Sequence, residues 1–212
     1  EKGDLLSYTG CGLPYYISGK VASASALISN ADDSVRNIRY FEAIKNVGTL
    51  SSTLALSVDR ESRTVHCRNL RTGELTDVSY DVLVLATGAV PNVPAIPGVD
   101  DEHVHTLYSL QDAEAIRKEL QATTAPDVAI VGGGLIGVSF AESLVDAGAR
   151  VTMLERRDRI LADHFDQDMA ERVEIALVRR GVKVVDDVTV SSVRRQGGRL
   201  VLLAGDSSYA VD

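Results

Sequence analysis

Apolar residues follow the most regular pattern between positions 127 and 155. A short apolar run over 128–131 is typical of a strand that is buried on both faces. Apolar residues then recur at helical spacing as far as Gly148, which can end a helix in the left-handed conformation. A second apolar run over 151–154 ends on Glu155. The pattern predicts a strand, a helix and a second strand.

Three glycines lie where the first of these strands meets the helix. Gly132, Gly134 and Gly137 form a G-x-G-x-x-G motif. The first glycine permits a tight turn, the second lets a pyrophosphate approach the backbone, and the third lets the helix pack closely on the sheet. Glu155, 23 positions after Gly132, can accept hydrogen bonds from ribose hydroxyls. The motif predicts a dinucleotide site; the alternative is a glycine-rich turn that binds no nucleotide.

The rest of the chain alternates between extended and helical patterns. We expect a loop over 21–30 and helices over 34–41, 109–120 and 166–180, the first of them capped by Asp32, Asp33 or Ser34. We expect extended or strand segments over 47–58, 64–70, 75–80, 82–86, 182–185 and 188–211. Of these, 64–70 and 75–80 should form a hairpin, 82–86 a buried strand, 182–185 a third parallel strand and 188–211 short antiparallel strands. Ser109 and Asp112 resemble a capping box.

Cys11 is a candidate for chemistry outside the glycine motif. Pro14 is tolerated only in the first turn of a helix, so Cys11 should lie at or beside the N-cap. At that position the helix dipole favours the reactive thiolate. The alternative is an inert buried cysteine. Cys67 falls inside the predicted hairpin with no thiol or base near it in sequence, and we interpret it as structural.

Composition and charge exclude several classes of protein. The chain has 212 residues, enough for one large or two modest domains. Its net charge of -8 argues against a nucleic-acid binder. No apolar run is long enough to span a membrane, no signal peptide is visible, and two cysteines 56 positions apart do not suggest a disulfide framework. The four histidines fit no metal-site pattern. We expect a cytoplasmic protein without a metal.

Several segments together resemble a known family. They are the glycine motif and the stretches 1–8, 11–16, 85–89 and 94–98. They are similar to the FAD-dependent pyridine nucleotide-disulfide oxidoreductases, in the single-cysteine branch of coenzyme A disulfide reductases, NADH oxidases and NADH peroxidases. The resemblance covers almost the whole chain and is weakest over 21–56. It implies that the chain is an internal fragment of a longer protein.

The resemblance implies an α/β fold with two Rossmann-like nucleotide-binding domains. Residues 1–107 should form a partial FAD-binding domain that contains Cys11 and a proline-rich crossover. Residues 108–212 should form a C-terminally incomplete NAD(P)-binding domain, with a parallel sheet and a small antiparallel meander. The whole protein should be a homodimer.

The resemblance also assigns the site residues. Cys11 is implied as the catalytic redox cysteine, and Ser7, four positions earlier, matches a pattern of the branch. FAD-binding positions are implied at Glu1, Lys2, Ser7, Ala55, Thr87 and Gly88. NAD(P)H-binding positions are implied at Gly132, Gly134, Leu135, Ile136, Gly137, Glu155 and Arg156.

Three features bear on the cofactor preference, the hydride transfer and the thiol substrate. The acidic Glu155 favours NADH, whereas Arg156 and Arg157 could offset its repulsion of a 2′-phosphate; we expect a preference for NADH. Ser139 stands where the family often has Glu, which puts the geometry of hydride delivery in doubt. Gly10 stands where coenzyme A disulfide reductases often have Asn, which leaves the thiol substrate undetermined.

The implied reaction passes hydride from NAD(P)H through FAD to the sulfur of Cys11. The oxidised cysteine would be a mixed disulfide with a small thiol such as coenzyme A, or a sulfenic acid. The acceptor would be a small-molecule disulfide, a peroxide or oxygen. A ferredoxin- or rubredoxin-type NAD(P)H reductase is one alternative, since it needs no cysteine at this position. A nicotinamide-nucleotide binding module without thiol chemistry is another. Whether a rhodanese domain follows stays open.

Overall fold

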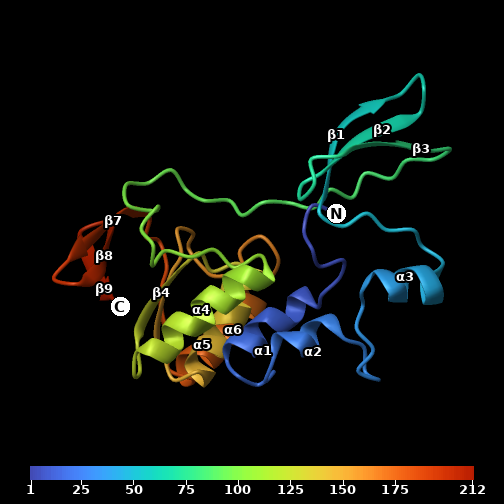
Figure 1. Ribbon diagram of the computed structural model, residues 1–212. Helices are drawn as coiled ribbons and strands as arrows, with labels where there is room; N and C mark the ends of the chain where they lie inside the picture. Colours follow the sequence, from blue (N-terminus) through green and yellow to red (C-terminus); the bar gives the residue numbers. More distant parts are fainter. The chain divides into compact units, whose positions relative to one another are not determined.

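The computed structural model describes residues 1–212, which divide into two compact units (Figure 1). The first unit comprises residues 1–9 and 23–89, and the second comprises residues 10–22 and 90–212. The domain boundary between residues 107 and 108 stays a prediction. None of the helices combines the length and the apolar character that a membrane crossing requires.

An antiparallel sheet is the main element of the first unit. Its strands β1 (Thr53–Asp59), β2 (Thr64–Asn69) and β3 (Leu75–Ser79) are hydrogen-bonded in that order. The predicted hairpin is therefore confirmed. Its turn forms because the Asn69 side chain accepts the N–H groups of Arg71 and Thr72, and because Gly73 adopts a φ of +76°. Cys67 is buried on β2, as its structural interpretation requires.

The helices of the first unit differ from the predicted ones. A short helix, α2 (Ala24–Ile28), lies where we expected a loop. Helix α3 (Ile38–Lys45) begins later than predicted, because Asn37 is its N-cap and accepts the Tyr40 N–H. Asp32 does not cap this helix, since its carboxylate accepts the N–H and hydroxyl of Ser34 in a local turn. The prediction of a helix over 34–41 was wrong in its start and its cap.

The predicted buried strand over 82–86 was also wrong. No strand pairs with this segment, and Val82, Val84 and Leu85 are 82%, 79% and 72% exposed. An apolar run is compatible with a strand, but a strand forms only where a neighbour accepts its backbone hydrogen bonds. The extended segment expected over 47–58 is regular only from Thr53 onward.

The second unit contains a parallel sheet covered by helices. Strands β4 (Asp127–Val131), β5 (Arg150–Leu154) and β6 (Lys183–Val185) lie in that order. The helices are α4 (Leu110–Ala122), α5 (Leu135–Asp146) and α6 (Gln167–Arg179). The capping box of α4 is present as predicted. The largest fully buried side chains are Leu144, Met153, Leu154 and, in the turn after β5, Ile160.

A second, antiparallel sheet completes this unit. Strands β7 (Val190–Gln196), β8 (Arg199–Ala204) and β9 (Ser207–Val211) form the predicted meander. Alternate residues of β8 are buried, so one face of the meander packs into a core that includes Leu154 of the parallel sheet. Asp212 then donates its N–H to the Asp127 carbonyl, which ties the end of the meander to β4. The α/β architecture is thus confirmed.

The Cys11 segment, defined as Gly10–Ala22, belongs to the second unit. It contains a 3-10 turn, η1 (Gly10–Gly12), and the short helix α1 (Leu13–Ile17). Leu13 and Ile17 are buried, and α1 packs against α4 and α5. Pro14 lies in the first turn of α1, as its missing N–H predicts.

Candidate nucleotide site and redox cysteine

The turn between β4 and α5 is shaped by its glycines. Gly132 adopts a φ of +112°, which side chains rarely tolerate, and its N–H donates to the Leu154 carbonyl on the neighbouring strand. Gly134 is the N-cap of α5 and provides no side-chain cap. The first N–H groups of α5 are therefore left for an external acceptor, which is the arrangement that binds phosphate at helix N-termini.

The space around each glycine differs. A Cβ at Gly137 would overlap the Gly132 carbonyl oxygen, so this glycine is required for helix–strand packing. A Cβ at Gly133 would lie 2.7 Å from Ile160 Cγ2. A Cβ at Gly134 would meet nothing within 4 Å, so the space beside the helix N-terminus is open. The turn thus has a filled side toward the core and an open side that can accept a pyrophosphate.

Glu155 follows β5 directly and is buried beside the turn. Its carboxylate accepts the Gly133 N–H at 2.6 Å and the Arg157 N–H at 2.9 Å, one on each oxygen. Each oxygen keeps acceptor capacity, because an ionised carboxylate offers about four lone-pair sites. Glu155 therefore fixes the glycine turn and can still accept ribose hydroxyls.

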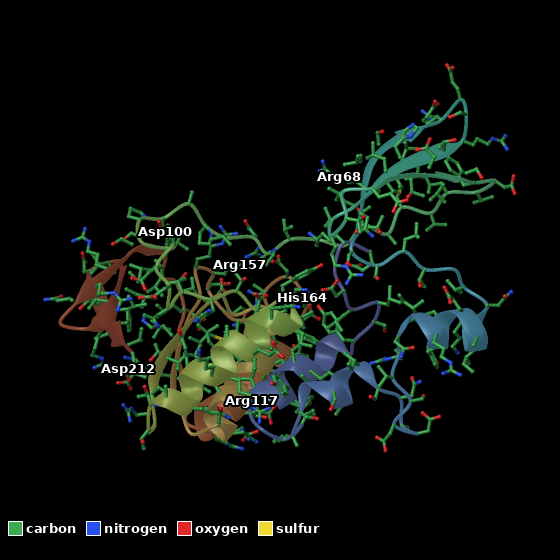
Figure 2. The ribbon with its side chains drawn as sticks, in the orientation of Figure 1. Arg68, Asp100, Arg117, Arg157, His164 and Asp212 are labelled. Carbon is green, nitrogen blue, oxygen red and sulfur yellow. The ribbon has the colours of Figure 1, made fainter.

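The arginines after Glu155 are not equivalent. Arg157 pairs with Asp163 at 2.6 Å and Arg159 pairs with Asp158 at 3.2 Å (Figure 2 labels Arg157). Arg156 is exposed and forms no ion pair. Arg156 and Arg157 are the two arginines that could offset the repulsion between Glu155 and a 2′-phosphate. Of these two, only Arg156 is without an acidic partner.

The first turn of α5 exposes apolar side chains. Leu135 and Ile136 are 51% and 63% exposed. Ser139, in the next turn, is exposed and lines a groove between α5 and α6. Glu142 also lines this groove, but it pairs with Arg180 at 3.2 Å and does not face the glycine turn as a free carboxylate.

Cys11 lies one residue before the Gly12 N-cap of α1, which confirms its predicted position beside the helix start. Its thiol is free and exposed, whereas the Cys67 thiol is free and buried. Three contacts hold the segment: Arg117 of α4 donates to the carbonyls of Tyr16 and Val21, and Lys20 pairs with Asp146 of α5 at 2.5 Å (Figure 2 labels Arg117). The exposed cysteine and the glycine turn are thus parts of one compact unit.

The family described as pyridine nucleotide-disulphide oxidoreductase matches residues 1–212. The chain belongs to this family. An NADH oxidase of Enterococcus faecalis is 32% identical over 189 residues, which are 87% of this chain and 39% of that protein. An NAD(P)H sulfur oxidoreductase (CoA-dependent) of Pyrococcus abyssi is 35% identical over 174 residues, which are 82% of this chain and 36% of that protein.

A solved structure agrees with these relatives. The NAD-dependent persulfide reductase from A. fulgidus superposes with a TM-score of 0.92 at 35% identity, covering 100% of this chain and 39% of that one. The chain therefore spans less than half of the length of the proteins it matches. The predicted family and fold class are confirmed, and the cofactors of this oxidoreductase family are FAD and a pyridine nucleotide.

The flavin-side positions implied by the family all lie in the first unit. The Glu1 carboxylate accepts the Gly3 N–H at 2.8 Å, and its carbonyl accepts the Thr53 N–H at the start of β1. Lys2 is exposed, Ser7 is half-buried and Ala55 is exposed on β1. Thr87 and Gly88 lie in the segment that forms no strand. The structure brings Glu1 to β1, and the flavin-binding roles of these residues stay predictions.

Sequence reasoning did not identify one residue at the edge of the parallel sheet, Asp186. It follows β6 directly, as Glu155 follows β5. Burial, with the nearby carboxylates of Glu174 and Glu155, raises the pKa of Asp186 to about 6. One sequence signal could have indicated it: an acidic residue immediately after the third parallel strand.

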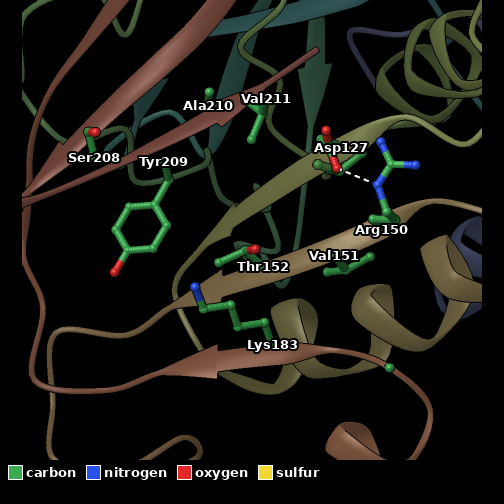
Figure 3. Close-up of a pocket in the computed structure, with 11 residues that line it drawn as sticks. Asp127, Arg150, Val151, Thr152, Lys183, Ser208, Tyr209, Ala210 and Val211 are labelled. Carbon is green, nitrogen blue, oxygen red and sulfur yellow. Dashed lines mark hydrogen bonds and ion pairs between the residues drawn. The ribbon is translucent and has the colours of Figure 1, made fainter.

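A pocket of about 420 Å³ lies at the opposite, amino ends of the parallel strands (Figure 3). Lys183 lies over the Tyr209 ring there, with its Nζ 5.3 Å from the ring centroid. Asp127 is paired with Arg150 at 2.6 Å and with Arg199 at 2.5 Å, and the Arg150 hydrogen bond is the main reason that its pKa falls to about 2. Open parallel sheets bind nucleotides at the carboxyl ends of their strands, so this pocket is not the candidate nucleotide site.

Proposed function

We propose that this chain carries the pyridine-nucleotide site and the redox cysteine of a flavin-dependent NAD(P)H oxidoreductase. The observation that carries the proposal is the glycine turn, which is closed by Gly137 toward the core and open at Gly134 beside the free N-terminus of α5. A pyrophosphate fits such a turn, and an adenosine ribose fits beside Glu155. The chemistry that the family's cofactors supply is hydride transfer between nicotinamide and flavin.

We propose that backbone N–H groups and a few side chains of this chain bind the nucleotide. The N–H groups at the start of α5 hold the phosphates, and Gly134 permits their approach. Leu135 and Ile136 present apolar surface next to this position. Glu155 accepts ribose hydroxyls and repels a 2′-phosphate, so NADH is preferred over NADPH. Arg156 opposes this preference, but Arg157 is occupied by Asp163 and contributes less.

We propose that Cys11 is the residue that attacks the substrate. Its thiolate attacks one sulfur of a small disulfide, a mixed disulfide forms, and the other half leaves as a thiolate. The exposure of Cys11 and the burial of Cys67 support this assignment. Relatives named as a CoA-dependent sulfur oxidoreductase and a persulfide reductase support a small sulfur compound as the substrate. A homodimer and a cytoplasmic location stay predictions.

Oxygen or peroxide is a second candidate acceptor, because another relative is named an NADH oxidase. In that case Cys11 would cycle through a sulfenic acid and not through a mixed disulfide. The two candidates differ in the adduct that Cys11 carries in the oxidised protein, which mass spectrometry identifies.

Substitution of Cys11 in the full-length protein tests the thiol chemistry. Cys11→Ser should abolish NADH-dependent disulfide reduction, because a hydroxyl forms neither a mixed disulfide nor a sulfenic acid. NADH binding should remain, since the glycine turn is unchanged. Cys67→Ser is the matched control and should keep the activity. Disulfide reduction at the wild-type rate by the Cys11 variant would favour a plain electron-transfer reductase instead.

A further inference from the structure

Each of the three parallel strands is followed, at the same edge of the sheet, by either the glycine turn or an acidic residue. The glycine turn follows β4, Glu155 follows β5 and Asp186 follows β6. The strands lie in the order β4, β5, β6, so these features follow one another along the edge. In the adenosine half of a dinucleotide, phosphate, ribose and base also follow one another. Phosphate at the turn and ribose at Glu155 would direct the base toward Asp186.

The backbone around Asp186 is held firmly to the segment that contains Glu155. The Glu155 N–H donates to the Val185 carbonyl, and the Val188 N–H donates to the Glu155 carbonyl, both at 2.9 Å. The Asp187 N–H donates to the Arg157 carbonyl at 2.8 Å. The position of the Asp186 side chain is therefore set by the same strand ends that set Glu155.

The Asp186 carboxyl has an unmet hydrogen-bonding requirement. Its Oδ1 atom is buried and has no hydrogen-bond partner. Buried polar atoms are almost always hydrogen-bonded, so an exception requires an explanation such as a missing ligand. The charged groups that act most on this carboxyl are all acidic: Glu155 and Asp158 after β5, Glu174 on α6 and the adjacent Asp187. The missing partner is accordingly a hydrogen-bond donor.

We propose that Asp186 reads the adenine base of the pyridine nucleotide by accepting a hydrogen bond from its exocyclic amino group. The inference rests on the proposed nucleotide site. Glu155 is already next to the ribose position, which leaves the amino group as the donor for Asp186. The nicotinamide hypoxanthine dinucleotide has an oxo group at this position. This oxo group is a hydrogen-bond acceptor and cannot donate to the Asp186 carboxylate. Asp186 therefore discriminates between the two bases.

Binding of the two oxidised dinucleotides to this chain, measured by calorimetry, tests the proposal. At pH 8 the wild type should prefer NAD⁺ over the hypoxanthine analogue by about tenfold or more, as expected for a hydrogen bond to a charged group. Asp186→Ala should abolish the preference. Asp187→Asn, at the adjacent exposed carboxyl, is the matched control and should keep it.

The pH dependence of binding provides a second measurement. Burial and the nearby carboxylates raise the pKa of Asp186 to about 6. The preference of the wild type for NAD⁺ should therefore shrink as the pH falls from about 8 to about 5, as the charged acceptor is lost. Asp186→Asn keeps the size of the side chain and should bind both dinucleotides independently of pH in this range.

The outcomes separate this inference from the proposed function. If NAD⁺ binds but Asp186→Ala weakens both dinucleotides equally, the base is not read by Asp186 and only the inference fails. If the wild type shows no preference between the dinucleotides, the inference fails in the same way. If neither dinucleotide binds to any variant, the proposed nucleotide site fails and the inference fails with it.

Discussion

Gly137→Ala is the most direct perturbation of the glycine turn. The added Cβ would overlap the Gly132 carbonyl oxygen, and it would also lie 3.3 Å from Ile130 Cγ2. The first of these neighbours is backbone and cannot rotate away. Helix α5 must therefore move from β4 by about 1 Å to restore a separation of 3.0 Å, the shortest that real Cβ atoms keep.

The size of the effect follows from the packing of α5. Ala141 and Leu144 of this helix are fully buried, so a displacement of α5 disturbs the core that they share with Met153. Overpacking of this kind costs about 1–3 kcal/mol. For a chain of this size, that cost lowers the melting temperature by about 2–12 °C. Displacement of the helix N-terminus should also weaken NADH binding.

Gly134→Ala is the matched control, because it adds the same methyl group where nothing lies within 4 Å and where φ is -78°. This variant should melt close to the wild type and still lose NADH binding, since the methyl group occupies the space reserved for phosphate. Thermal unfolding followed by circular dichroism and NADH titration followed by fluorescence provide the two measurements. A Gly137→Ala variant as stable as the wild type would refute the packing role of Gly137. Wild-type NADH binding by Gly134→Ala would refute the phosphate position.

Two further predictions concern charged residues. Glu155→Gln should reduce the preference for NADH over NADPH by roughly tenfold, because the charge that repels a 2′-phosphate is removed; an unchanged ratio of dissociation constants for the two cofactors would contradict this. Asp127→Asn should lower the melting temperature at pH 7, where the carboxylate pairs with Arg150 and Arg199. Because the folded-state pKa is depressed from 3.8 to about 2, the difference between this variant and wild type should shrink as the pH falls from about 4 to about 2. A difference that persists at pH 2 would show that the pairs do not cause it.

Local features were predictable from the sequence, and features that depend on distant neighbours were not. The glycine turn and the Ser109 capping box are set by residues a few positions apart, so their geometry follows from spacing alone. The segment 82–86 is apolar, but its state depends on a strand neighbour that spacing does not reveal. Asp186 was missed for the same reason: its burial and three of its acidic neighbours come from other elements.

The ionised carboxylate of Asp186 should also reduce the stability of the folded chain. Its pKa is raised from 3.8 to about 6 in the folded state, so the folded chain binds this proton more tightly than the unfolded chain does. Stability is therefore lost as the pH rises from about 4 to about 6, and the loss is complete above that range.

Asp186→Asn removes this titration and should stabilise the chain by about 1 kcal/mol above pH 6, after allowance for solvent screening of a partly exposed group. At pH 3 or below the variant and the wild type should be nearly equally stable, because the carboxyl is then mostly neutral in both the folded and the unfolded chain. Urea unfolding at pH 8 and at pH 3 measures both limits. A variant that is less stable at pH 8 would mean that the Asp186 carboxylate has a stabilising partner in the chain. The variant could instead be more stable at pH 8 and no longer distinguish adenine from hypoxanthine. That result would show that the Asp186 carboxyl lowers the stability of the chain while it serves base recognition.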